Sequence, residues 1–332
     1  MTRRAPRAKL RLANLPTPLF RHDALDALVG APVWVKRDDM TGGVETGNKV
    51  RKLEYLLADA QARKASVVIT CGGFQSNHCR ATAVLARACG MRSVLLLRAS
   101  DPPPAIPAGN AFLDALVGAE IRVITPAEYA DRDALMAHVA NELRTQGQTP
   151  YVIPEGGSNG LGALGYVDAM AELRDQLDAG EAGAPRAFDM IAFACGSGGT
   201  AAGVALGAAQ HGVASRAVAF AVCDDAAYFE HKAADLMAEA RALSPALATP
   251  APLSIEDAYR GPAYGIPTDD QVAFLIRVAR ATGLVLDPVY TGKALYGLAR
   301  IRDKPAALCF IHTGGHPGLL ADTARLCQHP DW

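Results

Sequence analysis

Residues 67 to 78 read Val67-Val68-Ile69-Thr70-Cys71-Gly72-Gly73-Phe74-Gln75-Ser76-Asn77-His78. A run of β-branched residues leads into two glycines and a group of polar side chains, and a helical pattern then continues to about residue 88. This order predicts a buried strand, a tight turn and a helix, which together make one βα unit. The polar group follows the carboxyl end of the strand, where open α/β sheets bind their ligands.

The same alternation of strand and helix recurs along the chain. Further strands are expected at residues 32–37, 93–97, 121–125, 151–154, 190–194, 218–222 and 308–312. Helices are expected at residues 50–62, 132–146, 162–177, 200–210, 226–243, 270–282 and 292–301, with another beginning near residue 110. We therefore predict an α/β fold with parallel-rich twisted sheets, flanked by helices and joined by right-handed crossovers.

Composition and charge limit the kind of partner. The chain has 332 residues, half of them hydrophobic, and its 33 basic and 34 acidic residues nearly cancel. This balance argues against binding nucleic acid, and a small-molecule partner is expected. No long apolar run follows the basic residues 1–11, which favours a mobile arm over a signal peptide or membrane anchor. The seven cysteines are scattered singly, which favours a reducing, cytoplasmic environment over a disulfide framework.

A lysine stands at the start of a predicted helix, directly after a glycine-led turn. The stretch is Gly47-Asn48-Lys49-Val50-Arg51-Lys52-Leu53-Glu54-Tyr55, and its apolar residues fall at helical spacing. Most lysines in such a helix are solvated. We nevertheless interpret Lys49 as the chemical centre of the chain, because other stretches supply the groups that a reactive lysine needs.

The first of these stretches is a glycine-rich loop that follows a strand and opens a helix, Cys195-Gly196-Ser197-Gly198-Gly199-Thr200. Backbone N–H groups at a helix start, uncrowded by side chains, form a site suited to one phosphate. A glycine-rich packing turn is the alternative interpretation. The loop lacks the Gly-Lys-Ser/Thr ending of a P-loop and the dinucleotide fingerprint, which argues against a nicotinamide oxidoreductase.

Polar residues gather in three other places. Gln75-Ser76-Asn77-His78 is more polar than helix capping requires, although Ser76 alone is typical of an N-cap. Asp287-Pro288-Val289-Tyr290-Thr291-Gly292-Lys293 offers a tyrosine and a hydroxyl, and His312-Thr313-Gly314-Gly315-His316 follows the last strand. The two histidines suggest a metal, but no carboxylate or cysteine shares their motif, so we expect no metal there.

Together these stretches offer a lysine, a cup for a single phosphate, a tyrosine to lie against a ring and hydroxyls to meet a ring nitrogen. This set matches pyridoxal 5′-phosphate. The lysine would bond to the cofactor aldehyde, which requires a neutral amine. A dry pocket supplies that form, because it disfavours the charged lysine and so lowers its pKa.

The stretches resemble the D-cysteine desulfhydrase and 1-aminocyclopropane-1-carboxylate deaminase family, within the tryptophan synthase β-like (fold type II) group of pyridoxal-phosphate enzymes. The resemblance rests on Arg37-Asp38-Asp39 and on residues 47–54, 75–82, 196–200 and 287–293, and it extends from about residue 15 to 319. It implies a homodimer. It also implies two domains with the cofactor between them: a large cofactor-binding domain from residues 1–50 and 161–332, and a small inserted domain from residues 51–160.

The resemblance implies roles for single residues. Lys49 would hold the cofactor and move the Cα proton of the substrate. The other cofactor-binding residues would be Asn48, Lys52, Ser197, Gly198, Gly199, Thr200, Tyr290, Thr291 and Thr313. The substrate would meet Gln75, Ser76, Asn77, His78 and Tyr264, and Ser76, Tyr264 and Tyr290 would join Lys49 in catalysis. The sequence leaves His78 between a direct and a supporting role, and it leaves the reactivity of Cys79 open.

The cyclopropane deaminases of this family carry glutamate after the Val-Tyr pair and leucine before the last Gly-Gly. This chain has Thr291 and Thr313 instead, as the desulfhydrases do. A glutamate can keep a pyridine nitrogen protonated, whereas a threonine hydroxyl only hydrogen-bonds to it. Expelling a thiolate asks less of the cofactor than breaking a carbon–carbon bond.

We therefore expect β-elimination of D-cysteine to pyruvate, ammonia and hydrogen sulfide. Related lyases acting on L-cysteate, D-serine or 3-chloro-D-alanine are alternatives that would use the same lysine, and a cyclopropane deaminase is a further one. A non-catalytic protein that binds an amino acid or the cofactor is the alternative of another class, because a fold alone does not establish activity.

Overall fold

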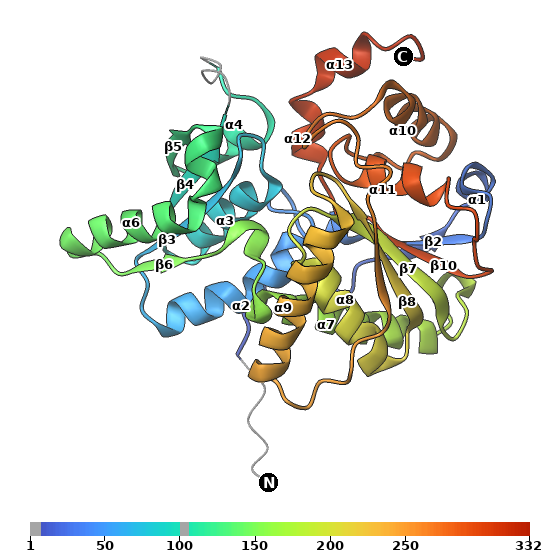
Figure 1. Cartoon of the computed structure of the whole chain (residues 1–332), viewed down its shortest axis with the longest axis horizontal. Helices are drawn as coiled ribbons and strands as arrows, with labels where there is room; N and C mark the ends of the chain where they lie inside the picture. The colour runs from blue at the N-terminus through green and yellow to red at the C-terminus, as the bar shows by residue number, and fades with distance from the viewer. Residues whose placement is uncertain (1–7, 100–105) are drawn as a thin grey trace.

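The computed structural model describes residues 8–99 and 106–332, and its strands form two sheets (Figure 1). The strands are β1 (Leu19–Arg21), β2 (Val33–Lys36), β3 (Val67–Gly73), β4 (Arg92–Arg98), β5 (Glu120–Ile124), β6 (Pro150–Val152), β7 (Phe188–Cys195), β8 (Ala214–Ala221), β9 (Leu253–Glu256) and β10 (Leu308–Ile311). Every pair of neighbouring strands is parallel except β1 with β2. The prediction of parallel-rich sheets is confirmed.

Helices separate these strands along the chain. They are α1 (Asp23–Val29), α2 (Lys49–Ala62), α3 (Asn77–Ala88), α4 (Gly109–Leu116), α5 (Pro126–Ala130), α6 (Arg132–Thr145), α7 (Gly160–Asp178), α8 (Gly199–His211), α9 (Ala226–Leu243), α10 (Asp269–Thr282), α11 (Thr291–Leu298), α12 (His316–Leu320) and α13 (Thr323–Cys327). Short 3-10 turns lie at Asp38–Met40, Glu155–Gly157 and Glu181–Gly183. No helix among the described residues is long and apolar enough to cross a membrane.

The larger sheet has six strands in the order β1-β2-β10-β7-β8-β9, so it joins both ends of the chain. Successive residues of β7 face opposite sides, as the two-residue period of a strand requires. Ile191 and Phe193 pack toward α7 and α8, whereas Met190 and Ala192 pack toward α10 and α11. Both faces are therefore buried, which is why residues 190–195 of β7 are continuously apolar.

The smaller sheet has four parallel strands in the order β5-β4-β3-β6. Val68 of β3 packs with Leu53 of α2 and Leu85 of α3 on one face. Ile69 packs with Val139 of α6 on the other face. Figure 1 shows this sheet and its helices on the left, the six-stranded sheet on the right and α2 between them. The carboxyl ends of β3 and β7, each followed by a helix, supply the two loops that the sequence marked as functional.

A buried ion network fixes α2 against the six-stranded side. The Arg51 guanidinium donates to Asp38 through Nε (2.9 Å) and Nη2 (2.8 Å), and it reaches Glu172 of α7 over 3.0 Å and 2.9 Å. Arg51 and Asp38 are almost completely buried. The network places the first turn of α2, and with it Lys49, relative to the six-stranded sheet.

The sequence missed short elements, namely β1, α1, α5, β9, α12 and α13, which have three to seven residues each. Elements of this length show too few turns or alternations for a period to be recognised. Most of the predicted N-terminal arm, residues 1–7, lies outside the described residues. The described part of this arm lies on α2: Leu10 donates its backbone N–H to the Glu54 carbonyl over 3.0 Å. The division into two domains stays a prediction.

Candidate functional site

A cavity of about 660 Å³ lies where the loops after β3 and β7 meet the start of α2. Its volume is in the range of small-molecule and cofactor sites. It brings together most of the predicted site residues: Asn48, Lys49, Ser76, Asn77, His78, Ser197, Gly198, Thr200, Tyr264, Tyr290 and Thr313. Lys52, Gly199, Gln75 and Thr291 do not line it; the first two lie directly behind its wall, as described below.

Lys49 is the first residue of α2 and its side chain enters the cavity. The preceding Gly47 has a φ of +113° and packs against the carbonyl of Thr313, an approach that a side chain there would obstruct. The Lys49 amine donates to Asn48 Oδ1 over 3.1 Å. Burial lowers the pKa of Lys49 to about 8. A substantial share of this amine is therefore neutral near pH 8, as a nucleophilic lysine requires.

The glycine-rich loop opens α8 toward the cavity. Gly198 has a φ of +80° and is the N-cap of α8, so the helix begins at the cavity that Gly198 and Thr200 line. The first backbone N–H groups of a helix have no partner within it. A methyl group at Gly199 would lie 2.8 Å from Lys52 Nζ and 2.6 Å from Ser158 Oγ. The side chains of Lys52 and Ser158 therefore pack directly against the loop, and only glycine at position 199 avoids a clash with them.

Lys52 is a buried lysine whose amine contacts only neutral oxygens. Its Nζ donates to the Gly156 carbonyl (3.2 Å) and to Ser158 Oγ (3.3 Å). No ion pair to Lys52 is found in the described part of the chain, and burial followed by repulsion from Lys49 holds its pKa well below the ordinary value. A bound phosphate would supply the missing counter-charge, so the loop, Lys52 and Ser158 fit a phosphate-bearing group.

Ser158 was not predicted from the sequence. Its hydroxyl lies 2.9 Å from Ser197 Oγ and accepts the Gly199 backbone N–H over 3.2 Å. It comes from the turn after Glu155–Gly157, far from the glycine loop in sequence. Only the preceding glycine pair hints that the chain approaches another segment closely at this point.

Ser76 and Asn77 form another edge of the cavity. Ser76 Oγ accepts the Cys79 N–H over 3.2 Å, so Ser76 is an N-cap as well as a lining residue. Asn77 Oδ1 accepts a hydrogen bond from Asn110 Nδ2 over 3.0 Å. Gln75 turns away, because its side chain bonds to the Ala108 carbonyl and the Asn110 N–H. Its predicted contact with substrate is untested.

His78 and Cys79 have the surroundings of neutral groups. His78 Nε2 pairs with Thr70 Oγ1 over 2.8 Å, and its Nδ1 has no hydrogen-bond partner among the described residues. Burial, with Lys49 and Lys52 nearby, holds the pKa of His78 well below its ordinary value. Burial likewise holds the pKa of the Cys79 thiol well above its usual range, which gives an unreactive thiol.

Arg80 lies in the same helix, α3, as His78 and Cys79. Its guanidinium donates to Asn110 Oδ1 over 2.7 Å, to the Thr46 carbonyl over 2.8 Å and to the Val44 carbonyl. It therefore ties the helix after β3 to the loop that precedes Lys49.

Two tyrosines cover the cavity. The hydroxyls of Tyr264 and Tyr290 lie 2.7 Å apart, and the rings meet edge to face with centroids separated by 6.0 Å. Burial raises the pKa of both phenols above the ordinary value, so both are neutral at pH 7. Arg98, at the end of β4, stacks over the Tyr264 ring at 5.5 Å.

The two threonines used to assign the substrate lie differently. Thr313 lines the cavity, and its carbonyl accepts the Asn48 N–H over 3.1 Å. The Thr291 hydroxyl donates to Asp287 Oδ1 over 2.7 Å and accepts the Asp287 N–H over 2.9 Å. Thr291 therefore lies one layer behind the wall, and its predicted contact with a ring nitrogen stays a prediction.

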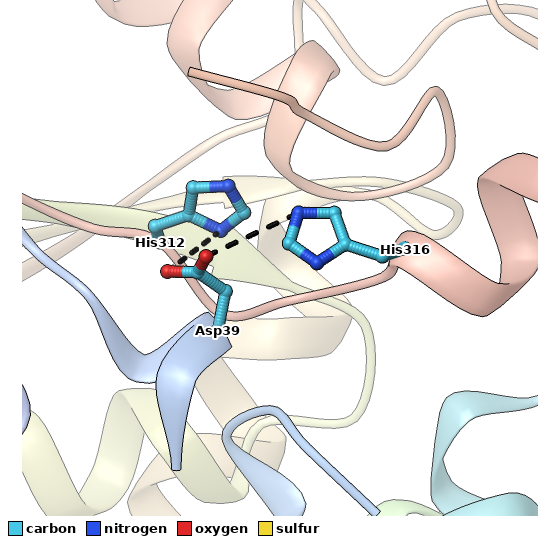
Figure 2. A group of neighbouring side chains, drawn as sticks. All are labelled: Asp39, His312 and His316. Atoms are coloured by element: carbon cyan, nitrogen blue, oxygen red, sulfur yellow. Dashed lines mark ion pairs between the residues drawn. The ribbon is translucent and has the colours of Figure 1, made fainter. Parts of the chain in front are cut away.

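The histidine pair lies beside a carboxylate that the sequence analysis did not assign to it. Figure 2 shows His312 and His316 turned toward Asp39, at 3.8 Å and 4.0 Å. Three such ligand atoms within 4.8 Å are a possible metal site. The motif itself contains no carboxylate; Asp39 comes to lie beside the histidines because it follows β2, which is paired with β10.

The hydrogen bonds of this cluster nevertheless occupy the atoms that a metal would need. Nε2 of both histidines lies within 3.0 Å of the Val285 carbonyl, which can only accept, so both nitrogens carry protons. His312 Nδ1 accepts the Gly314 N–H, and Arg37 donates to both Asp39 oxygens over 2.7 Å and 2.6 Å. The cluster holds the loop that carries Thr313.

Comparisons with known proteins agree with this geometry. The model of the family described as pyridoxal-phosphate dependent enzymes matches residues 10–314. The chain is 42% identical to the bifunctional D-cysteine desulfhydrase/1-aminocyclopropane-1-carboxylate deaminase of Arabidopsis thaliana, a mitochondrial protein, over 93% of this chain and 78% of the relative. It is 36% identical to the D-cysteine desulfhydrase of Serratia proteamaculans, with 94% and 95% covered. The crystal structure of an ACC deaminase homologue is 37% identical and covers 96% of this chain and 95% of its own, with a TM-score of 0.85, which confirms the predicted fold.

Proposed function

The chain belongs to the family of pyridoxal-phosphate-dependent enzymes, and we propose that it catalyses β-elimination of D-cysteine to pyruvate, ammonia and hydrogen sulfide. The observation that carries the proposal is the position of Lys49, whose amine enters the same cavity as the glycine loop and the Ser76–Asn77 edge. A pKa of about 8 makes that amine able to bond an aldehyde and to accept a proton.

The residues around the cavity divide the work. When bound, the cofactor supplies an electron-withdrawing ring that accepts the electron pair left at the substrate Cα. Lys49 takes the Cα proton. Ser76 and Asn77 receive the substrate carboxylate, which places the Cα–H bond toward the lysine. Tyr290 lies against the ring, and Tyr264, whose hydroxyl meets that of Tyr290, faces the substrate.

The choice of D-cysteine over the cyclopropane amino acid rests on Thr291 and Thr313. No carboxylate occupies either position, so neither can keep a pyridine nitrogen protonated. The names of the relatives divide between the two activities; a putative deaminase of Thermotoga maritima is 40% identical. The cyclopropane deaminase is therefore the second candidate, ahead of lyases acting on L-cysteate, D-serine or 3-chloro-D-alanine.

Three features outside the site belong to the same proposal. We propose a homodimer, because Phe112 and Leu116 of α4 and Leu320 of α12 are about half to two-thirds exposed on contacting helices. A species of about twice 34.8 kDa in sedimentation would support it, and a monomer would contradict it.

We propose a cytoplasmic location, supported by seven unpaired cysteines. We also propose the division into residues 51–160 and the remainder, supported by the separate sheets.

The test is the release of sulfide and pyruvate from D-cysteine by the cofactor-loaded enzyme. L-cysteine, L-cysteate and 1-aminocyclopropane-1-carboxylate are run alongside, and Lys49→Ala is the matched control. Equal amounts of sulfide and pyruvate from D-cysteine alone, lost in Lys49→Ala, are expected. A keto acid formed only from another substrate would overturn the choice of D-cysteine, and full activity of Lys49→Ala would overturn the mechanism.

A further inference from the structure

Lys293 is a buried, charged residue of the Asp287–Lys293 stretch to which the proposed reaction assigns no role. It lies in α11 with its side chain fully buried. Its Nζ donates to three backbone carbonyls, those of Val222 (3.2 Å), Arg260 (2.6 Å) and Ala263 (2.9 Å). A neutral amine has only two protons to donate, so all three bonds require the ammonium form.

No ion pair to Lys293 is found across residues 8–99 and 106–332, so the three carbonyls are the direct partners of this buried charge. Burying a charge in this way is costly unless it is fully hydrogen-bonded. Burial accordingly lowers the pKa of Lys293 to about 8. Core packing alone would be achieved at lower cost by an apolar side chain of the same length, so the location of the carbonyls matters.

All three carbonyls belong to segments that form the cavity. Val222 follows β8 and precedes Cys223 and Asp224, which line the cavity. Arg260 and Ala263 bracket the loop that leads into Tyr264, and this loop contains no helix and only a single isolated bridge, from Ala263 to Ile266. Lys293 Nζ also lies where a side chain on Gly261 would go, at 3.3 Å. The ammonium group therefore fills the inside of the loop.

The contact between Tyr264 and Tyr290 connects the loop back to α11. Tyr290 is the N-cap of α11, the helix that carries Lys293 three residues later. Lys293 holds Ala263, the neighbouring Tyr264 reaches across the cavity wall, and its hydroxyl meets that of Tyr290 at 2.7 Å. One helix thus supplies one tyrosine and fixes the backbone of the other.

We propose that Lys293 is a positioning residue, which sets the Tyr264 hydroxyl against Tyr290 by holding the backbone of the 260–264 loop. The proposal rests on the proposed function only in taking Tyr264 to face the substrate. A misplacement of about 1 Å at such a group costs on the order of a hundredfold in rate. Lys293 acts through Tyr264, so its contribution disappears when the Tyr264 hydroxyl is absent.

A double-mutant cycle tests this dependence. In the cofactor-loaded enzyme, Lys293→Met is expected to lower kcat/KM for D-cysteine by about ten- to a hundredfold. In a Tyr264→Phe background the same substitution is expected to lower kcat/KM less than about threefold, because the hydroxyl through which Lys293 acts is already missing. Independent effects of the two substitutions would multiply. Multiplicative effects would overturn the proposal.

Lys36→Met serves as the matched control in both backgrounds. Lys36 is an equally buried lysine, but it bonds to Thr17, Glu172 and Gln176, outside the cavity. Its effect is expected to be the same with and without the Tyr264 hydroxyl. Equal coupling of Lys36 and Lys293 to Tyr264 would show general destabilisation and overturn the assignment.

Amide hydrogen exchange gives a readout that needs no substrate. Lys293→Met, or Lys293→Gln if the first variant does not fold, is expected to exchange faster in residues 259–266 while α8 is unchanged. Unchanged exchange in the loop would overturn the positioning role. If the wild-type enzyme processes none of the substrates tested, the proposed function fails, and the exchange experiment still decides the role of Lys293.

Discussion

The side-chain amide of Asn48 donates a hydrogen bond to the Thr200 hydroxyl over 3.1 Å. This contact joins the residue before Lys49 to the end of the glycine loop, two points 152 residues apart in the chain. The Lys49 amine and the candidate phosphate site are therefore fixed relative to each other without a ligand. Such preorganisation makes two properties of the apoprotein predictable, the protonation of Lys49 and the affinity for phosphate.

Cofactor uptake should depend on pH through Lys49. An ordinary lysine is about 0.03% neutral at pH 7, whereas a pKa of about 8 gives about 10%. Because the neutral amine reacts, the rate of covalent cofactor incorporation should rise nearly tenfold per pH unit below 8 and level off above it. Stopped-flow absorbance of apoprotein mixed with pyridoxal phosphate measures this rate. A rate still climbing between pH 9 and 10 would mean that burial does not lower the pKa of Lys49.

Removing the Lys52 charge should weaken cofactor binding. A hydrogen bond to a charged group contributes about 1.5–3 kcal/mol, so Lys52→Met should raise the Kd for pyridoxal phosphate about ten- to a hundredfold. Ser158→Ala should have a smaller effect, because its hydroxyl is neutral. Equilibrium dialysis measures both, with the exposed Lys64→Met as control. Lys52→Met should leave the Kd for pyridoxal unchanged, because pyridoxal has no phosphate. If this variant weakened binding of pyridoxal as much as binding of pyridoxal phosphate, the role of Lys52 in phosphate binding would be contradicted.

The Asp38–Arg51 pair should dominate stability at the start of α2. Asp38→Asn leaves Arg51 incompletely paired, and breaking a buried pair costs about 3–5 kcal/mol in the free energy of unfolding. The same substitution at Asp178, exposed and paired with Arg174, should cost less than about 1 kcal/mol. Urea denaturation at pH 7 compares the two, and equal losses would show that burial of the first pair adds nothing.

The contribution of Asp38 should also fade in acid. Burial alone would raise the pKa of Asp38, but the charge and hydrogen bonds of Arg51, the Lys36 charge and the Tyr166 hydrogen bond together outweigh it and hold that pKa below the ordinary value. The unfolded chain then binds the proton more readily, so the stabilisation is complete above about pH 4 and is lost as pH falls through the lower, folded pKa. The difference between wild type and Asp38→Asn should therefore shrink in denaturation curves at pH 3. A difference that grows in acid would reverse the assigned sign.

The sequence was sufficient to predict those features that depend on residues adjacent in the chain. Buried strands such as β7 are continuous apolar runs, and Lys49 is marked by the glycine and asparagine before it. Ser158 and Asp39 were missed because their significance comes from residues distant in sequence. Ser158 acquires a role only when Glu155–Gly157 approaches the glycine loop, and Asp39 meets His312 only because β2 pairs with β10. Local spacing contains neither fact.

Substrate choice should change when the two threonines are replaced. Thr291→Glu combined with Thr313→Leu places a second carboxylate beside buried Asp287. Two neighbouring negative charges are unfavourable there, so one carboxylate must take up a proton or pair with a protonated ring nitrogen. We expect kcat/KM for D-cysteine to fall about ten- to a hundredfold, and release of the keto acid from 1-aminocyclopropane-1-carboxylate to rise relative to it. Thr291→Gln with Thr313→Leu is the control of matched size. If the glutamine variant shifts the ratio as far as the glutamate variant, shape and not the charge beside the nitrogen separates the two activities.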